Sequence, residues 1–170
     1  MPLNQEFPIL DGVTPSWTDI ICRATPAGGA LIQVQDIQAI DTAVSMEIGE
    51  QKGASGGRVI KRTTGSSKFE ASMILYYSGY VNFLRELSKV AQAKGFVRGN
   101  QVGVSLVHFG IEVQFSVPGD VEIYQYRIKG CRLTGRALKV KEGIDAQLVE
   151  CNLSPLEIVD VIDGKEIVPL

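Results

Sequence analysis

One serine stands in a pattern that some hydrolases use for catalysis. Gly53-Ala-Ser55-Gly-Gly57 matches G-x-S-x-G, in which a strand, a sharp turn and a helix lift the serine toward a histidine base. The residues after Gly57, Arg-Val-Ile-Lys-Arg-Thr-Thr-Gly, do not begin a helix, and no aspartate lies between Ser55 and His108, the single histidine of the chain. A hydrolase that uses Ser55 is therefore the least favoured of three functions weighed below.

Histidine and cysteine, the usual ligands of transition metals, form no cluster in the sequence. His108 follows an alternating apolar segment, and we expect a hydrogen-bonded structural residue. Cys22, Cys131 and Cys151 are widely separated and odd in number, with no C-x-x-C pair, so we expect small core thiols. Neither glycine-rich pattern for binding a nucleotide is present. We expect no catalytic residue, no cofactor and no metal, and a protein that is not an enzyme.

The stretch from Gly49 to Ser67 combines five glycines with an excess of positive charge. Its cations are Lys52, Arg58, Lys61 and Arg62. Its one acid is Glu50, so the local charge is +3 (4 − 1). A connection of this length without its own core is usually either disordered or functional. Two interpretations stay open: a solvated flexible hairpin, or an arm that binds an acidic surface on another subunit. Nucleic-acid binding is less favoured, because the stretch has no aromatic residue on which a base could stack.

Length and composition favour one β domain. The chain has 170 residues, and valine (18) plus isoleucine (16) make up 34 of them. These β-branched residues suit strands, and the 18 glycines suit turns. With 17 basic and 19 acidic residues the net charge is −2, so no global positive field would hold nucleic acid. The amino terminus lacks a signal-peptide pattern and no apolar run could span a bilayer, so we expect synthesis in a reducing, aqueous compartment and no membrane partner.

Alternating apolar residues predict a succession of strands. Residues 1–17 are expected to form an extended arm, because they hold three prolines and the turn signal Asp11-Gly12. The expected strands are 18–24, 31–48 with a break near Asp41-Thr42, 69–75, 102–106, 111–117, 121–133 and 144–153. The last of them contains a one-residue phase slip that is typical of a β-bulge, and Pro118-Gly119-Asp120 and Asp163-Gly164 predict turns.

One helix is expected among the strands. Tyr80, Leu84, Leu87 and Ala91 recur at helical spacing. Ser78 is placed to cap the start of this helix, and Gly95 to end it. The fold class that follows is mainly β: an antiparallel β-sandwich or half-barrel with one flanking α-helix, in a single domain over residues 1–170.

The order of the segments resembles a known family. The pieces that carry the resemblance are, in order, Met46-Glu-Ile-Gly-Glu-Gln-Lys-Gly, Arg62-Thr-Thr-Gly, Lys68-Phe-Glu-Ala-Ser-Met-Ile-Leu-Tyr, a helix, Ile111-Glu-Val-Gln-Phe, Ile128-Lys-Gly-Cys-Arg-Leu-Thr-Gly and Lys141-Glu-Gly-Ile-Asp-Ala-Gln-Leu-Val-Glu-Cys-Asn-Leu-Ser-Pro-Leu-Glu-Ile. Over residues 18–164 this succession is similar to the tail tube proteins of tailed bacteriophages. That family is related in fold to the tube proteins of contractile injection systems and of type VI secretion. None of the pieces carries a catalytic signature, so the resemblance rests on order and spacing.

The resemblance implies a structural role in a virion. Six copies would form a ring whose inner strands join into a barrel, and stacked rings would form the tail tube through which DNA is ejected into the host. The loop 49–67 would reach the adjacent ring, with Lys52, Gly53, Gly56, Gly57, Arg58, Lys61 and Arg62 as its contact residues. An acidic lumen would repel phosphate, so that DNA slides through without specific binding.

The resemblance also implies partners and a location. The protein would bind itself, the tape measure protein, the baseplate or tail-tip protein, the terminator protein and, in a contractile tail, the sheath. It would be assembled in the host cytoplasm and reside in the tail of the virion. The alternative function is a monomeric β-barrel module that binds a small ligand in a closed apolar cavity, with the glycine-rich loop as its lid.

Overall fold

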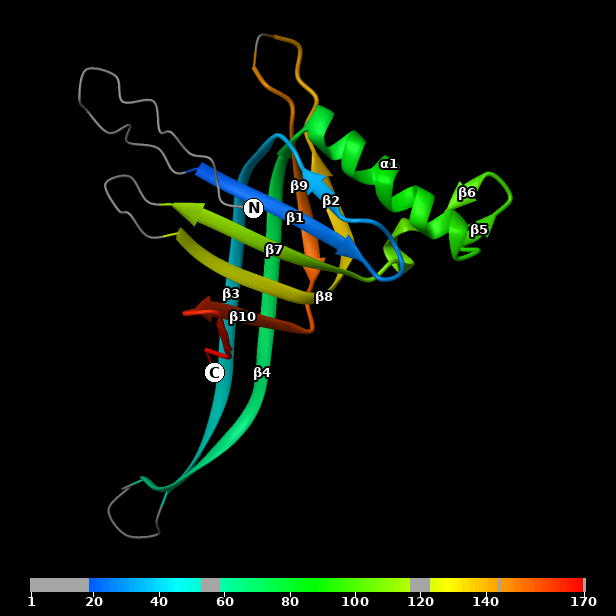
Figure 1. Cartoon of the computed structure of the whole chain (residues 1–170). Helices are drawn as coiled ribbons and strands as arrows, with labels where there is room; N and C mark the ends of the chain where they lie inside the picture. Colours follow the sequence, from blue (N-terminus) through cyan, green and yellow to red (C-terminus); the bar gives the residue numbers. More distant parts are fainter. Residues whose placement is uncertain (1–18, 53–58, 117–122, 144, 170) are drawn as a thin grey trace, which may run out of the picture.

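Antiparallel strands make up most of the computed structural model, which describes residues 19–52, 59–116, 123–143 and 145–169. The strands are β1 (Asp19–Pro26), β2 (Ile32–Val34), β3 (Ile37–Lys52), β4 (Val59–Tyr76), β5 (Val97–Arg98), β6 (Gln101–Val102), β7 (Phe109–Ser116), β8 (Ile123–Leu138), β9 (Leu148–Ser154), β10 (Glu157–Ile162) and β11 (Lys165–Ile167). The helices are α1 (Tyr77–Ala93) and one turn of 3-10 helix, η1 (Val104–Leu106) (Figure 1). The arm expected at 1–17 and the turn at 118–120 lie outside the described residues.

Nine of the described strands form two sheets that share β8, and β5 and β6 form a separate two-stranded pair. The first sheet has the order β2-β1-β7-β8-β10-β11, and it uses β8 from residue 123 to 131. The second sheet has the order β3-β4-β9-β8, and it uses β8 from 132 to 138. The first sheet crosses in front of the long β3–β4 pair (Figure 1). An antiparallel half-barrel with one flanking helix is therefore confirmed as the fold class.

The core lies between the two sheets and under α1. Its fully buried side chains come from six elements: Cys22 (β1), Met73 and Leu75 (β4), Phe83 and Leu87 (α1), Ile111 and Val113 (β7), Ile128 (β8), and Val149 and Cys151 (β9). β3 contributes only partly buried side chains, such as Ile40 and Val44. The rings of Phe83 and Phe109 meet edge to face, with centroids 5.7 Å apart, and join the helix to the first sheet. Burial of each large apolar side chain contributes about 1.5–3 kcal/mol to folding.

The ends of α1 follow the expected signals only in part. Gly95 ends the helix as predicted: its φ is +75°, and the Gly95 and Phe96 amides donate to the carbonyls of Gln92 and Ala91. Ser78 does not cap the start, because the helix already begins at Tyr77. The Ser78 hydroxyl instead donates to Asp36 Oδ2 at 2.8 Å, which ties the helix to the turn between β2 and β3.

Three strand predictions are wrong in position. The break expected near Asp41-Thr42 lies at Asp36, whose φ of +56° turns the chain between β2 and β3, and β3 is then continuous. The segment 102–106 is only the end of β6 and η1 rather than a strand. The bulge expected at 148–149 lies instead in β8, where Thr134 is the extra residue between the pairs Leu133–Leu153 and Gly135–Asn152.

The stretch 49–67 is mostly paired strand rather than loop. β3 and β4 stay paired from Ile37–Leu75 out to Lys52–Val59, so only residues 53–58 connect them. β4 has a bulge at Gly65-Ser66, where two residues lie opposite the single residue Glu47 of β3. The bulge interrupts the alternation of apolar residues, which is why the sequence pattern predicts a loop here. Glycine is required there, because a Cβ on residue 65 would lie 2.1 Å from the Glu47 carbonyl oxygen. The result is one hairpin that extends well beyond the first sheet (Figure 1).

Candidate self-assembly surfaces

The outer side of β3 is a long strand edge. From Ile37 to Ile48, β3 pairs with β4, and no other described strand pairs with it. Monomeric β proteins normally protect such an edge with charge, proline or a short strand. Residues 37–46 contain no proline and a single charged residue, Asp41. The edge is therefore suited to accept a further strand.

The inter-subunit contact residues predicted from the sequence that the structure describes lie at the end of the β3–β4 hairpin. Lys61 lies opposite Gln51, Arg62 opposite Glu50, and Lys52 opposite Val59. The other predicted contact residues, Gly53, Gly56, Gly57 and Arg58, and the candidate nucleophile Ser55, lie outside the described residues. Ile48, just before this end, is 57% exposed. The hairpin thus presents a strand edge and an apolar side chain away from the core.

A second surface, which we call the aromatic mouth, opens between the two sheets beside the β3 edge. It is a hollow of about 380 Å³ lined by Ile20, Ile40, Asp41, Thr42, Val113, Phe115 and Tyr126. The ring of Phe115 stacks on that of Tyr124, with centroids 5.5 Å apart, and meets Tyr126 edge to face at 6.2 Å. Burial raises the pKa of Tyr126, and the nearby charges of Asp41 and Asp160 raise it further, so the phenol is neutral. The mouth is apolar with an acidic rim.

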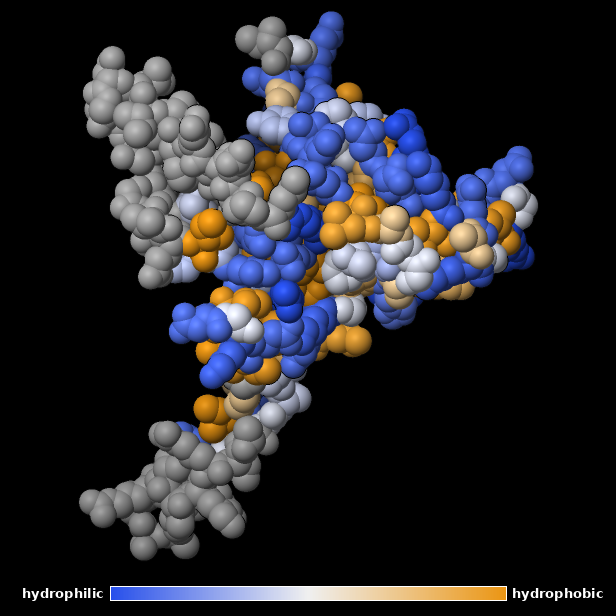
Figure 2. Space-filling view, in the orientation of Figure 1, coloured by the Kyte–Doolittle hydropathy of each residue, from blue (hydrophilic) through white to orange (hydrophobic). Residues whose placement is uncertain are grey.

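A third surface, the apolar–basic knob, lies at the far end of α1 and consists of β5, β6 and η1 with Lys94. Val97 and Leu106 are 45% and 47% exposed, and Lys94 and Arg98 are exposed as well. Hydrophobic side chains are visible at this end of the molecule (Figure 2). The knob is anchored, because the Gly103 amide donates to the Phe96 carbonyl at 2.8 Å and Arg132 Nε donates to the Ser105 carbonyl at 3.0 Å.

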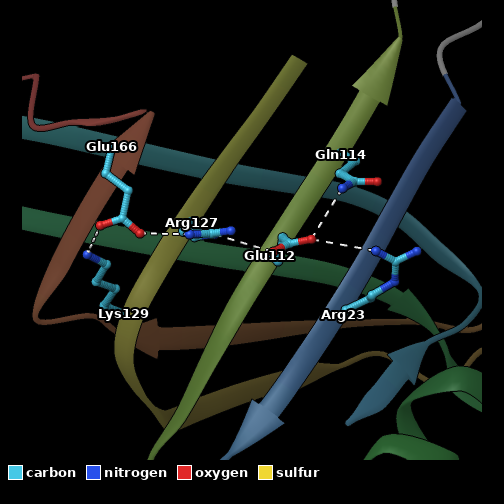
Figure 3. A network of polar contacts seen from close by, with 6 residues as sticks. All are labelled: Arg23, Glu112, Gln114, Arg127, Lys129 and Glu166. Atoms are coloured by element: carbon cyan, nitrogen blue, oxygen red, sulfur yellow. Dashed lines mark hydrogen bonds and ion pairs between the residues drawn. The ribbon is translucent and has the colours of Figure 1, made fainter. Parts of the chain in front are cut away.

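A ladder of ion pairs crosses the exposed face of the first sheet (Figure 3). Glu112 on β7 contacts Arg23 on β1 at 3.5 Å and Arg127 on β8 at 3.3 Å. Glu166 on β11 contacts Arg127 at 2.8 Å and Lys129 at 2.5 Å. Hydrogen bonds from Lys129 and Arg127 hold the pKa of Glu166 below its ordinary value. The ladder ties the β10–β11 hairpin to β8 and leaves these five residues with a net charge of +1 (3 − 2).

The remaining sequence candidates do not form a site. The imidazole of His108 is exposed rather than packed as a structural residue, and its carbonyl accepts a hydrogen bond from the Ala27 amide. Cys22, Cys131 and Cys151 are buried and unpaired by disulfide, so the prediction of core thiols is confirmed. Burial raises the pKa of Cys22 and Cys131 to about 12 and that of Cys151 to about 11.

The described residues contain neither a candidate metal site nor a candidate membrane-spanning helix. No group of three or more histidine, cysteine, aspartate or glutamate side chains is arranged to hold a metal ion there. Likewise, no described helix combines the length and apolarity needed to cross a membrane. Met73, Ile111 and Ile128 are buried in the core between the sheets, and the aromatic mouth is an open hollow, whereas the ligand-binding alternative requires a closed apolar cavity.

Comparison with known proteins gives a fold. No family model and no curated protein matches the sequence. Among solved structures, a chain of the anti-feeding prophage cap, which terminates its tube, superposes with a TM-score of 0.57 at 11% identity, covering 94% of this chain and 98% of that one. A chain of the sheath–tube complex of the extracellular contractile injection system PVC gives 0.55 at 11% identity, covering 87% and 88%. A chain of the anti-feeding prophage baseplate, solved with six-fold symmetry, gives 0.56 at 7% identity, covering 86% and 93%.

These identities establish the fold alone. The chain has the fold found in tube, cap and baseplate assemblies of injection particles, and the resemblance drawn from the order of its segments is confirmed at that level. The structures that it resembles are those of structural assemblies.

Proposed function

We propose that this protein is a non-enzymatic structural subunit that self-assembles into stacked hexameric rings, which form the tail tube of a bacteriophage and conduct DNA into the host. The observation that carries the proposal is the unprotected outer edge of β3 in a chain with the fold of tube assemblies. A soluble monomer would expose that edge to indiscriminate pairing, whereas closure into a ring removes it.

The second sheet supplies both edges that a ring needs. β3 ends the sheet on one side, and residues 132–138 of β8, which pair with β9, end it on the other. Addition of β3 from one copy to this part of β8 in the next copy would continue one antiparallel sheet around the ring. Hydrogen bonds between such strands give affinity, and closure of the sheet leaves no strand unpaired.

The exposed face of the second sheet suits the wall of a channel. A hollow of about 470 Å³ on this sheet is lined by Asp41, Glu70 and Glu150 together with small or polar side chains such as Ala43, Ser72 and Asn152. Lys68 offsets part of this charge, because its Nζ contacts Glu70 at 2.5 Å. Lys139, Lys141 and Asp145 line a neighbouring hollow on the same sheet, so this face carries charges of both signs with a small acidic excess. Neither hollow is lined by an aromatic side chain on which a base could stack, so DNA would slide along the wall.

The β3–β4 hairpin would join one ring to the next. It extends past the first sheet along the strand direction of the second sheet (Figure 1). We propose that Lys52, Gly53, Gly56, Gly57, Arg58, Lys61 and Arg62 contact the adjacent ring, as the resemblance implies. The caps, baseplate and sheath present in the neighbouring structures support tail proteins of those kinds as partners.

Electron microscopy tests the proposal directly. Purified protein at high concentration should form rings or tubes, and a deletion of Lys52–Arg62 should remain folded by circular dichroism yet fail to stack. A protein that stays monomeric under crowding and with other tail proteins would refute the structural role. Tubes of normal length from the deletion variant would refute the role of the hairpin.

A further inference from the structure

The aromatic mouth and the apolar–basic knob lie at opposite ends of the molecule. The mouth is formed where β1 begins and β7 ends, next to β3, since Ile20 pairs with Phe115 and both line it. The knob lies at the far end of α1, on the other side of the body from the β3 edge (Figure 1). Two different surfaces at opposite ends can bind each other only between copies, and such a head-to-tail contact generates a ring when its rotation closes.

We propose that the apolar–basic knob of one copy inserts into the aromatic mouth of the next copy. This inference rests on the proposed self-assembly and names the side-chain contact that would hold neighbouring copies together. Exposed Val97 and Leu106 would cover the rings of Phe115 and Tyr126, which line a hollow of about 380 Å³. Aromatic and aliphatic side chains packed in this way form the usual core of a specific interface.

Charge complementarity selects the knob as the occupant. Asp41 lines the mouth, and Asp160 on β10 lies directly opposite Tyr126 on β8; both aspartates are exposed. The knob carries Lys94 and Arg98, both exposed. Opposite charges around an apolar centre set the register of two partners and speed their encounter.

The competing occupant is the chain's own amino-terminal segment. The described chain begins at Asp19, in β1 beside the mouth, and 18 residues precede it in the sequence. That segment contains the acids Glu6 and Asp11 and no lysine or arginine. Placing it at the mouth would bring its acids toward Asp41 and Asp160, whereas the knob brings cations.

The position of the mouth also fits the edge of β3. Ile40, Asp41 and Thr42 belong to β3 and line the mouth, so a copy that adds a strand to β3 reaches the mouth at the same time. On the other side, Arg132 lies at the start of the β8 segment that ends the second sheet and holds η1 of the knob. Strand addition and knob insertion therefore use the same two sides of the molecule.

Cysteine cross-linking tests the contact in the full-length protein. A chain carrying both Thr42→Cys and Arg98→Cys should, on oxidation, give a ladder of covalent multimers on a denaturing gel. Each single variant should give none beyond dimer, and the three native thiols are buried and should not react. The matched control pairs Thr42→Cys with Arg85→Cys, an exposed residue in the middle of α1 that lies outside the knob and outside the β8 edge. A ladder as strong in the control as in the test pair, or no ladder in assembled test protein, would overturn the proposal.

Charge reversal gives an independent test. Lys94→Glu with Arg98→Glu should raise the concentration needed for ring formation about tenfold or more. Adding Asp41→Lys and Asp160→Lys in the same chain should restore it, while Arg85→Glu, a charge reversal in the middle of α1, should change little. Wild-type protein that forms no rings would remove the proposed function itself. Rings that form equally well in all variants, or a Phe7→Cys to Thr42→Cys cross-link within one chain, would overturn the knob contact alone.

Discussion

Replacing Gly65 with alanine should loosen the outer part of the β3–β4 hairpin without unfolding the body. Gly65 lies in β4 opposite Glu47, between the strand pairs Met46–Ser67 and Ile48–Thr64. An alanine Cβ would lie 2.1 Å from the Glu47 carbonyl oxygen and 2.9 Å from its carbonyl carbon. Both are backbone atoms, so no side-chain rotation relieves the clash and the strands themselves must move.

The free-energy cost of Gly65→Ala follows from the steric overlap between the new Cβ and the Glu47 carbonyl group. A Cβ essentially never approaches another heavy atom within 3.0 Å, so the contact must open by about 1 Å. Overpacking of this kind costs about 1–3 kcal/mol, and ~2 kcal/mol raises a local opening equilibrium about 30-fold. The melting temperature of the body should change little, because the buried side chains of β4, Ala71, Met73 and Leu75, lie beyond the bulge.

Hydrogen exchange of backbone amides measures this local opening of the hairpin. Amides in residues 47–50 and 62–65 of Gly65→Ala should exchange about 30-fold faster, whereas those of β7 and β8 keep the wild-type rate. Gly110→Ala is the matched control, because its Cβ would find Ile128 O at an ordinary 3.8 Å. Wild-type exchange in the hairpin of Gly65→Ala, together with tubes of normal length, would refute the requirement for glycine at the bulge.

Three further predictions concern the body of the protein. Phe83→Ala should lower the free energy of unfolding by about 3–5 kcal/mol in a denaturant titration, since Phe83 is 2% exposed and packs on the core. Because the Glu166 pKa is lowered from 4.5, its contribution is present above that pH and is lost as the pH falls through the lowered value, so the protection of β11 amides relative to the unfolded chain at the same pH should fall in acid. Glu166→Gln should remove this pH dependence, and an unchanged protection profile would contradict it. Finally, Cys22, Cys131 and Cys151 should resist alkylation at pH 8 in the folded protein and react fully when it is unfolded.

Sequence patterns predicted the body of the fold where one face of a strand is buried. β7 alternates Ile111 and Val113 with polar residues, and the structure buries both, so its pattern and its burial agree. The helix was found for the same reason, and its end was found because only glycine readily adopts the positive φ of Gly95. Both patterns are local in the sequence, and they predict the structure correctly because the tertiary packing buries the same residues.

The sequence did not predict the paired strands at the outer part of the β3–β4 hairpin, because these strands extend beyond the core. Past Met46, no opposing sheet imposes apolar alternation, so glycine and lysine there were interpreted as a loop. The aromatic mouth could not be found from local pattern, because Ile40 and Phe115 meet only through the crossing of two sheets. One pair of the ion-pair ladder could be predicted from the sequence, because the turn signal Pro118-Gly119-Asp120 predicts antiparallel pairing of the flanking strands. The structure pairs these strands with Glu112 opposite Arg127.

The single strand that belongs to both sheets has a mechanical consequence. β8 runs unbroken from Ile123, in the first sheet, to Leu138, in the second. Tension applied to either sheet therefore passes to the other through covalent backbone rather than through side-chain packing. The two sheets are thus joined covalently along β8, whereas β3, the far edge of the second sheet, pairs with no described strand of the first sheet. A neighbouring subunit bound along β3 would hold the two sheets together at the edge opposite β8, and would stiffen the subunit there.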